Sequence, residues 1–221
     1  MKKTYFLTIG QAPRPDIATS FDLYFKEESS VVWRGLLDDL TYQEAQKLYG
    51  KTAATKTSLT TTFKEGHSLV MDHQKVEAGL QKLIRKLKDA ALICILCTGS
   101  FNQLQSKEAL LLRADEIITE QLKDELDLGF LLPLKEQIPA AQKKWQVADR
   151  RLFQAVSPYN FSQEAAQLAL KNLQERQVKT IVMDCIGFNQ SIERRLKELA
   201  PEIHFILANE LVFAYVKQLL N

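Results

Sequence analysis

The sequence predicts an α/β protein of two similar lobes with parallel sheets, and a β-hairpin inserted in the first lobe. Short apolar runs alternate with amphipathic helical stretches along most of the chain, as in parallel sheets with crossover helices. The run at residues 91–96 is wholly apolar, and the run at 180–184 is apolar at its three central positions, which is typical of strands buried on both faces. A Cys-x-Gly triplet follows each run, so the two halves of the chain also resemble each other.

Local signals define the elements expected in the first half. Pro15 suits the first turn of a helix. Thr41 and Glu44 form a capping box that opens another helix, and Gly50 is placed to end it. The turn at residues 64–67 separates two strand-like runs and predicts a hairpin. The other elements expected are strands at 4–9, 31–37, 58–63, 68–73 and 91–96, and helices at 15–25 and 76–87.

The second half repeats the alternation of strands and helices. The polar stretch at residues 122–127 is the expected seam, so the predicted lobes span residues 1–122 and 123–221. The C-terminal helix of the second lobe can pack back on the first. The elements expected after the seam are strands at 129–133, 152–156, 180–184 and 203–207, and helices at 136–145, 164–175, 191–199 and 211–220.

Composition and charge exclude several classes of protein. The 221 residues include 29 basic and 27 acidic side chains, for a net charge of +2. The sequence has no basic patch of the kind that nucleic-acid binders need, so no nucleic-acid partner is expected. No apolar run approaches the roughly 20 residues of a membrane span. Residues 1–10 lack the apolar core and cleavage site of a signal peptide. Three cysteines are too few for a disulfide framework, so a cytoplasmic protein without a membrane partner is expected.

The internal repeat places a cysteine at the end of a strand in each half. Residues 92–99 align without gaps on residues 180–187, and both segments follow an amphipathic helix. Ligands of open parallel sheets bind at the carboxyl ends of the strands, where Cys97 and Cys185 are expected. Backbone N–H groups and helix dipoles at such places can lower a cysteine pKa from about 8.5 to roughly 3.5–7.5. The alternative is that both cysteines are small buried core residues.

Glycines beside the cysteines and two residues near the N-terminus complete the predicted site. Gly99 and Gly187 lack a Cβ, so a ligand can come close to the backbone donors there. Arg14, which Pro15 biases away from helical geometry, is a candidate to bind a carboxylate through two parallel hydrogen bonds. A solvated loop arginine is the alternative. Gln11 is a candidate to orient the same ligand.

Other polar residues near strand ends have less specific predictions. Asp38 and Asp184 are each as well suited to capping a loop or helix as to acid catalysis, and packing is expected of Tyr159. Cys94 lies inside a predicted strand and is assigned to the core. No second cysteine pair or neighbouring histidine completes a zinc site, so no metal is expected. Packing or hairpin positions are expected for the histidines: His67, His73 and His204.

Several short strings along the chain form a recognisable set. They are LTIGQAPRPD at 7–16, GLLD at 35–38, CTG at 97–99, DCIGF at 184–188, Pro133 with EQ at 136–137, and KWQV at 144–147. Together they resemble the AroM-like family, over nearly the whole chain, and LTIGQAPR is the most specific string. That family is similar to the aspartate/glutamate racemase superfamily, so the resemblance implies two pseudo-symmetric Rossmann-like lobes with the site between them.

The resemblance also implies a mechanism without a cofactor. In that superfamily, paired cysteines face each other across the α-carbon of a carboxylate substrate. One thiolate removes the α-proton and the opposite thiol delivers a proton to the other face. Carried over to this chain, Cys97 and Cys185 would be the two bases. The groups that would hold the carboxylate and the developing negative charge are the Thr98 hydroxyl and the backbone N–H groups around Gly99, Ile186 and Gly187.

The chain departs from the racemase pattern beside both cysteines. Racemases follow their first cysteine with Asn-Thr and their second with Thr and often His, whereas this chain has TG at 98–99 and IG at 186–187. Their N-terminal Asp-Ser is replaced by GQ at 10–11. The resemblance therefore carries over the two bases, but not the groups that recognise an α-amino substituent.

The leading hypothesis is a cofactor-independent enzyme that transfers a proton at the carbon next to a small carboxylate. Racemisation, isomerisation and related carbanion-type steps all fit this description. Two alternatives stay open. One is a carboxylate-binding or regulatory protein without turnover, and the other is a one-cysteine hydrolase or decarboxylase. The hairpin at residues 58–73 is a candidate contact surface for a homodimer.

Overall fold

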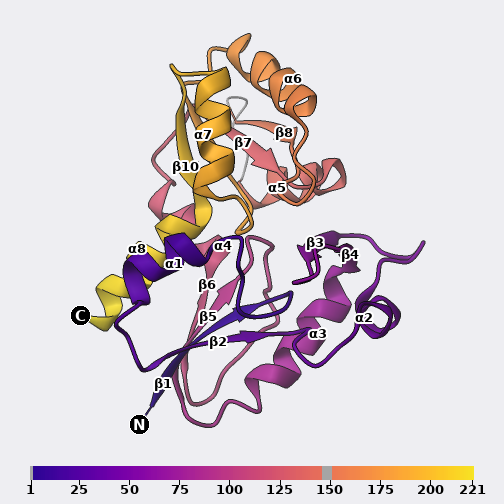
Figure 1. Ribbon diagram of the computed structural model, residues 1–221, viewed down its shortest axis with the longest axis vertical. Coiled ribbons are helices and arrows are strands. Elements are labelled where there is room, and N and C mark those ends of the chain that lie inside the picture. Colours follow the sequence, from indigo (N-terminus) through magenta and orange to yellow (C-terminus); the bar gives the residue numbers. More distant parts are fainter. Residues whose placement is uncertain (1, 146–150) are drawn as a thin grey trace.

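The computed structural model describes residues 2–145 and 151–221. Within them lie two four-stranded sheets, each wholly parallel, and a two-stranded antiparallel hairpin. Figure 1 shows the two sheets in separate lobes, and the predicted fold class is confirmed. Two residues of the KWQV string, Gln146 and Val147, lie outside the described residues. Among the described helices, none has the length and apolar character needed to cross a membrane.

The first lobe is built around the sheet β2-β1-β5-β6. The hairpin and two helices are inserted between β2 and β5, and α4 follows the last strand. The elements are β1 (Lys3–Thr8), α1 (Ala18–Phe25), β2 (Val31–Gly35), α2 (Tyr42–Tyr49), β3 (Ser58–Thr62), β4 (Ser68–Asp72), α3 (His73–Ile84), β5 (Ala90–Leu96), β6 (Leu110–Arg113) and α4 (Ala114–Gln121).

The second lobe is built around the sheet β10-β9-β7-β8. Helices connect its successive strands, and α8 closes the chain. The elements are β7 (Leu128–Leu132), the short 3-10 helix η1 (Lys135–Gln137), α5 (Ile138–Lys144), β8 (Leu152–Ala155), α6 (Gln163–Gln174), β9 (Thr180–Met183), α7 (Gln190–Leu199), β10 (His204–Leu207) and α8 (Ala208–Leu220).

Both sheets have the same strand order when strands are numbered within each lobe. The order in the first lobe is second, first, third, fourth, and reading the other sheet from β8 gives the same order. Thus β1 corresponds to β7, β2 to β8, β5 to β9 and β6 to β10. The similarity between the two Cys-x-Gly segments therefore extends to the topology of both sheets.

Some elements begin elsewhere than the sequence predicts. α1 begins at Ala18 rather than Pro15, because residues 15–17 form a turn in which the Arg14 carbonyl accepts from the Ile17 N–H. α3 begins at His73, because the side chain of Asp72 caps it. β6 and α4 lie where no element is expected. β6 has four residues, of which the first is exposed and three are partly buried, so it lacks the apolar run that marks an inner strand.

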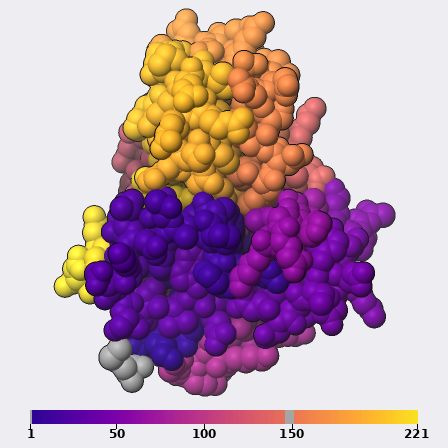
Figure 2. Space-filling model, viewed as in Figure 1, coloured from indigo at the N-terminus to yellow at the C-terminus, as the bar shows by residue number. Residues whose placement is uncertain are grey.

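One hydrophobic cluster runs through both lobes and holds them together. It joins side chains of β1 and α1 to side chains of β7, β9 and α8. Phe213 of α8 makes edge-on ring contacts with Phe6 and Phe21 at centroid distances of 5.9 and 5.4 Å. Figure 2 shows the yellow C-terminal end beside the indigo N-terminal residues. Because aromatic side chains bury large apolar areas, α8 fixes the second lobe against the first.

Candidate active site

Cys97 and Cys185 follow equivalent strands where the lobes meet. Cys97 comes directly after β5, and Cys185 comes two residues after β9. The hydroxyl of Thr98 donates to the backbone oxygen of Asp184 at 3.0 Å, so the two strand ends are in direct contact. Both thiols are more than nine-tenths buried. Burial raises the pKa of Cys97 most, and Cys185 is close enough for its charge to add to that rise.

Burial dominates the ionisation of Cys97. It raises the pKa of this thiol to about 12, although the backbone N–H of Gly99 and the ammonium of Lys144 act in the opposite direction. Gly99 lies against the sulfur, since a Cβ at this position would be 3.6 Å from Cys97 Sγ and 2.8 Å from a methyl group of Leu59. Cys97 is therefore a neutral thiol at neutral pH.

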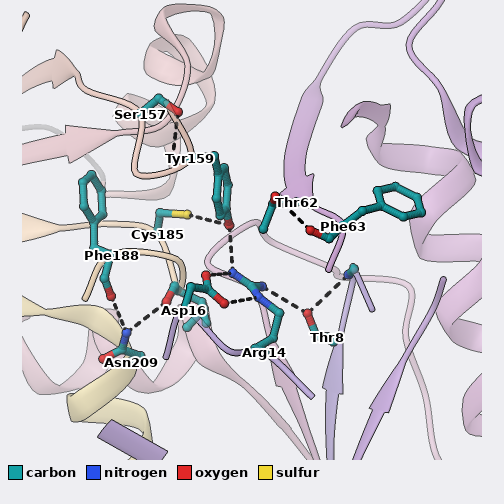
Figure 3. Close-up of polar contacts among 12 residues, drawn as sticks. Thr8, Arg14, Asp16, Thr62, Phe63, Ser157, Tyr159, Cys185, Phe188 and Asn209 are labelled. Carbon is teal, nitrogen blue, oxygen red and sulfur yellow. Dashed lines mark hydrogen bonds and ion pairs between the residues drawn. The ribbon is translucent and has the colours of Figure 1, made fainter. Parts of the chain in front are cut away.

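Cys185 has a polar chain of contacts that leads into the first lobe. The hydroxyl of Tyr159 lies 3.6 Å from Cys185 Sγ, and the guanidinium of Arg14 donates to that hydroxyl at 3.3 Å. Figure 3 shows this chain from the sulfur to the arginine. Burial raises the pKa of Cys185, while the Gly187 N–H, the Tyr159 hydroxyl and the Arg14 charge all oppose the rise.

The strand ends do not lower the pKa values of the thiols as the sequence predicts. The backbone N–H groups of Gly99 and Gly187 act in the expected direction, but burial raises the pKa of both thiols by more. Taking a thiolate out of water costs more than one N–H hydrogen bond returns. A thiolate here needs further partners, which Tyr159 and Arg14 supply to Cys185.

Arg14 is buried and paired within the protein. Its side chain binds Asp16 through both carboxylate oxygens, with Nε 2.8 Å from Oδ1. Nη1 donates to Thr8 Oγ1 at 3.3 Å. Burial opposes the positive charge, but Tyr159 and Asp16 raise the pKa of Arg14, so the guanidinium stays charged. The solvated loop arginine is therefore excluded: the guanidinium of Arg14 is buried against the Asp16 carboxylate and reaches Cys185 through Tyr159.

The ring of Tyr159 fills the space beside Gly187. A Cβ on Gly187 would lie 2.5 Å from both Cε1 and the hydroxyl oxygen of Tyr159, which is closer than such atoms pack. The absence of a side chain at Gly187 therefore lets the tyrosine reach the thiol. Packing is the role that the sequence predicts for Tyr159, and the structure adds contact of its hydroxyl with Cys185.

A buried ion pair from the second lobe closes over the two strand ends. Lys144, at the end of α5, lies with Nζ 2.7 Å from Asp184 Oδ2 and donates to the backbone oxygen of Thr98 at 3.2 Å. The indole N–H of Trp145 donates to the same carboxylate oxygen at 3.2 Å. Asp184 therefore ties α5 to β9, and Lys144 ties both to the end of β5.

A cavity of about 540 Å³ lies next to this ion pair. The first lobe lines it with the start of β3, the loop after β5 and α4, and the second lobe lines it with α5 and Asp184. Thr98, Gly99 and Asp184, which are close neighbours of the thiols in the chain, belong to the lining. Neither cysteine does, among the residues that the structure describes.

Gln11 is engaged in the loops of the first lobe. Its side-chain amide donates to the backbone oxygens of Leu37 and Leu40, both at 3.4 Å, and its oxygen accepts from the Lys64 N–H at 3.1 Å. The residue thus links the end of β1 to the loop after β2 and to the hairpin turn. Backbone groups of the protein therefore occupy both the NH₂ group and the oxygen of the side chain that the sequence suggests as a ligand contact.

Other residues singled out in the sequence have structural surroundings. Ile186 is 3% exposed within the shared hydrophobic cluster, so its side chain is part of the core. Asp38 accepts the N–H groups of Ala12 at 2.6 Å and Gly35 at 2.9 Å and acts as a loop cap. Cys94 is fully buried in the core. The described residues contain no group of three or more His, Cys, Asp or Glu side chains suited to a metal ion.

Three side chains of the cavity have no functional prediction from sequence. His73 Nε2 lies 2.7 Å from the backbone oxygen of Ser100, where the ring also stacks on Phe101. Asp115 lies in the first turn of α4, an element that the sequence does not reveal. Lys144 has a single sequence signal, its place in the KWQV string. These residues come together only because the start of α3, the start of α4 and the end of α5 line the same cavity.

The fold is similar to those of solved racemases and an isomerase. Glutamate racemase from Bacillus anthracis matches with a TM-score of 0.65 at 12% identity, over 99% of this chain and 81% of that one. Allantoin racemase from Pseudomonas fluorescens matches with a TM-score of 0.61 at 9% identity, over 99% and 90%. Maleate cis-trans isomerase from Nocardia farcinica matches with a TM-score of 0.55 at 12% identity, over 100% and 93%. At these identities the likeness concerns the fold.

Sequence comparison supplies the family. No curated protein sequence matches the chain. A family model described as AroM protein matches residues 5–220, a span that includes both strand-end cysteines and nearly all of the chain. The resemblance seen in the sequence is thereby confirmed: the chain belongs to the AroM protein family.

Proposed function

We propose that the protein is a cofactor-independent enzyme that moves a proton at the carbon next to a small carboxylate, with Cys97 and Cys185 as its two acid–base groups. One observation supports this above others: each cysteine follows the third strand of a sheet with the same strand order. Thiols that come from opposite lobes can address the two faces of one carbon. The reaction class is racemisation, isomerisation or another step through the same carbanion-like intermediate.

The proposed step replaces one C–H bond by another without a change in oxidation state. A thiolate takes the α-proton and becomes a thiol, and the electron pair of the broken bond moves into the carboxylate. The opposite thiol then gives its proton to the other face of the carbon and becomes a thiolate. In this proposal the backbone N–H groups of Gly99, Ile186 and Gly187 receive the developing negative charge, at about 1.5–3 kcal/mol for each charge-assisted hydrogen bond.

The surroundings of the two thiols support different starting roles. The Tyr159 hydroxyl and the Arg14 charge act against the burial that raises the pKa of Cys185, which makes Cys185 the better-supported base. The pKa of about 12 keeps Cys97 protonated, as an acid requires. Each turnover exchanges the ionisation states, so this asymmetry favours one direction of transfer.

A one-cysteine mechanism is a second candidate, because the contacts of Cys185 with Tyr159 and Arg14 make the two thiols unequal. In this version Cys185 attacks the substrate as a nucleophile, and Cys97 shapes the pocket. The similar Nocardia farcinica structure is that of a maleate isomerase mutant with a covalently bound succinylcysteine intermediate, so a related fold accommodates a covalent cysteine adduct.

Deuterium exchange tests the two-base proposal. The protein is incubated in D₂O with a panel of 2-hydroxy, 2-amino and 2-aryl carboxylates, and α-deuterium is followed by NMR. At least one compound is expected to gain deuterium, and Cys97→Ser and Cys185→Ser should each reduce interconversion by several orders of magnitude. Cys94→Ala is the matched control, since Cys94 lies in the core of the same strand that leads to Cys97, and it should retain activity.

The outcomes separate the candidates. Full interconversion by either serine variant contradicts the two-base mechanism. A covalent adduct on Cys185 alone, seen by mass spectrometry of the intact protein, supports the one-cysteine mechanism. Ligand-dependent thermal shifts without exchange or adduct for any bound compound indicate a binding protein without turnover.

A further inference from the structure

A leucine of the hairpin covers the glycine that follows Cys97. The position that a Cβ would take on Gly99 lies 2.8 Å from Leu59 Cδ2 and 3.6 Å from Cys97 Sγ. Leu59 and Cys97 belong to one hydrophobic cluster, and Leu59 is 4% exposed. Leu59 and Gly99 line the cavity of about 540 Å³, whereas Cys97 does not. The leucine side chain is therefore part of the cavity wall next to the sulfur.

Strand β3, which carries Leu59, lies over the ends of two neighbouring strands of the first lobe. A Cβ on Gly10, two residues after β1, would collide with the hydroxyl of Thr61. A Cβ on Gly99, three residues after β5, would collide with a methyl group of Leu59. β1 and β5 pair in parallel, and ligands of open parallel sheets bind at the carboxyl ends of the strands. The hairpin therefore covers the edge of the first sheet where a ligand is expected.

Contacts from both lobes hold Leu59 in this place. Within the hairpin, Leu59 pairs with Met71 of β4, which is fully buried. From the second lobe, the side-chain amide of Gln137 donates to the backbone oxygen of Ser58 at 3.0 Å. Because Ser58 directly precedes Leu59, this hydrogen bond fixes the backbone of β3 beside the leucine.

The second lobe has a tyrosine in the corresponding place. The ring of Tyr159 covers Gly187, as Leu59 covers Gly99. Each covering side chain comes from the segment between the second and third strands of its own sheet. The pseudo-symmetry of the lobes thus extends to the side chain that lies on the glycine of each Cys-x-Gly segment.

The two covering side chains have opposite chemistry. The hydroxyl of Tyr159 lies 3.6 Å from Cys185 Sγ and acts against the burial that raises the pKa of that thiol. Leu59 has no polar atom to stabilise a thiolate. Burial is the largest cause of the raised pKa of Cys97, and Leu59 belongs to the apolar cluster that buries this thiol.

We propose that Leu59 is a positioning residue of the site, which separates Cys97 from the cavity and keeps this thiol protonated until a ligand displaces the leucine side chain. Rotation about the side-chain bonds of Leu59 moves its methyl groups between staggered positions, so the thiol can be uncovered while β3 stays in place. The inference uses the proposed function only in giving Cys97 the role of an acid. The shielding itself holds for any reaction of that thiol.

Thiol modification in the absence of substrate tests this inference. The wild-type protein and Leu59→Ala are treated with methyl methanethiosulfonate from pH 6 to pH 10, and the modification of Cys97 is followed by peptide mass spectrometry. Leu59→Ala should react at least tenfold faster at Cys97, because water reaches the sulfur and each unit by which the pKa falls gives about ten times more thiolate. The rate should also level off at a lower pH than in the wild-type protein. Cys185 should keep its rate.

Other leucine variants separate shielding from a loss of stability. Leu69→Ala is the matched control, because Leu69 is 3% exposed in β4 of the same hairpin and belongs to the same cluster without lining the cavity. It should leave the Cys97 rate unchanged. Leu59→Met keeps an apolar side chain of similar volume and should retain the wild-type rate. Leu59→Val suits a strand and lacks the Cδ2 atom that faces Gly99, so it should accelerate Cys97 to a smaller extent than Leu59→Ala.

The outcomes decide between shielding and its alternatives. An unchanged Cys97 rate in Leu59→Ala and Leu59→Val overturns the inference. Equal acceleration in Leu69→Ala also overturns it, because a loosened hairpin would then explain the effect. Faster modification of Cys97 in Leu59→Ala without deuterium exchange into any carboxylate supports the inference and contradicts the proposed function. Deuterium exchange together with an unchanged Cys97 rate does the reverse.

Discussion

The segments at residues 97–99 and 185–187 have the same Cys-x-Gly pattern at equivalent strand ends, yet their surroundings differ. Cys97 lies beside the cavity, with Lys144 as the nearby positive charge. Cys185 contacts the hydroxyl of Tyr159, which connects it to Arg14. The residue between cysteine and glycine differs too: Thr98 bonds across to the other lobe, whereas Ile186 is part of the core.

This difference separates what the repeated backbone contributes to each thiol from what the individual side chains contribute. The shared backbone supplies the position of the sulfur and a glycine N–H beside it in both lobes. The charge near each sulfur comes from the opposite lobe, and it is carried by different residues: α5 supplies Lys144 to Cys97, and the segment after β1 supplies Arg14 to Cys185. A duplicated fold can therefore hold two thiols in equivalent positions and still give them unequal acidity.

The largest effect on stability is expected at Ile186, the buried middle residue of the second Cys-x-Gly segment. Ile186→Ala removes a buried side chain from the cluster that joins the lobes, which should lower the free energy of unfolding by about 2–5 kcal/mol. Urea unfolding followed by circular dichroism measures it. Thr98→Ala is the matched substitution and should cost much less. Equal losses at the two positions would contradict the different roles assigned to them.

The glycines should also respond unequally. Gly187→Ala puts a methyl group within 2.5 Å of the Tyr159 ring, whereas at Gly99 the nearest atom is a terminal methyl of Leu59 at 2.8 Å. Overpacking typically costs about 1–3 kcal/mol, and the rigid ring should place Gly187→Ala at the upper end and Gly99→Ala at the lower end. Unfolding free energies decide this, and a larger loss at Gly99 would reverse the comparison.

Tyr159→Phe should change the acidity of one thiol and not the other. The hydroxyl lowers the pKa of Cys185 against burial, so its removal raises that pKa and reduces the thiolate fraction at any pH below it. The rate of Cys185 modification by methyl methanethiosulfonate, followed by peptide mass spectrometry from pH 6 to pH 10, should fall about tenfold, for a lost hydrogen bond to a charged group of about 1.5 kcal/mol.

Cys97 provides the internal control for that experiment, because its modification rate should be the same in Tyr159→Phe as in the wild-type protein. Tyr42→Phe serves as the matched variant, since Tyr42 packs on Phe63 in the hairpin region. Equal slowing of both cysteines in Tyr159→Phe would mean that the tyrosine acts on access to the site rather than on the acidity of Cys185.

The smallest effect is expected for Thr98→Val, which keeps the shape of the side chain. It removes the hydrogen bond from Thr98 Oγ1 to the Asp184 carbonyl, and such a bond contributes about 1 kcal/mol net. Calorimetric unfolding should show this loss. A change well below the lower bound of about 0.5 kcal/mol for a hydrogen bond would indicate that α8 and the shared core, not the strand ends, hold the lobes together at this point.

Sequence patterns were sufficient for most of the fold because it depends on apolar runs and local caps. The run at 91–96 corresponds to β5 and the run at 180–184 to β9, and the capping box at Thr41 and Glu44 opens α2 as predicted. β6 and α4 could not be recognised, because β6 is short and partly exposed. Missing α4 also meant missing Asp115, a buried carboxylate that lines the cavity between the lobes.

The site was predictable at its centre and not in its surroundings. The repeat alone locates Cys97, Cys185 and the two glycines at strand ends, and the structure has them there. The roles suggested for Gln11 and Arg14 depend on distant partners. The loops after β2 and the hairpin turn engage Gln11, while Asp16 and Tyr159 engage Arg14.

Local patterns in the chain were enough to establish the order of most strands and helices, the similarity of the halves and the place of each cysteine at a strand end. Periodicity and capping are local properties, so they can be recognised without knowing what packs against them. Which charges surround each sulfur, and whether burial or hydrogen bonding prevails there, followed only from the folded arrangement. Ionisation depends on desolvation and on charges a few ångströms away, and segments far apart in the chain supply both.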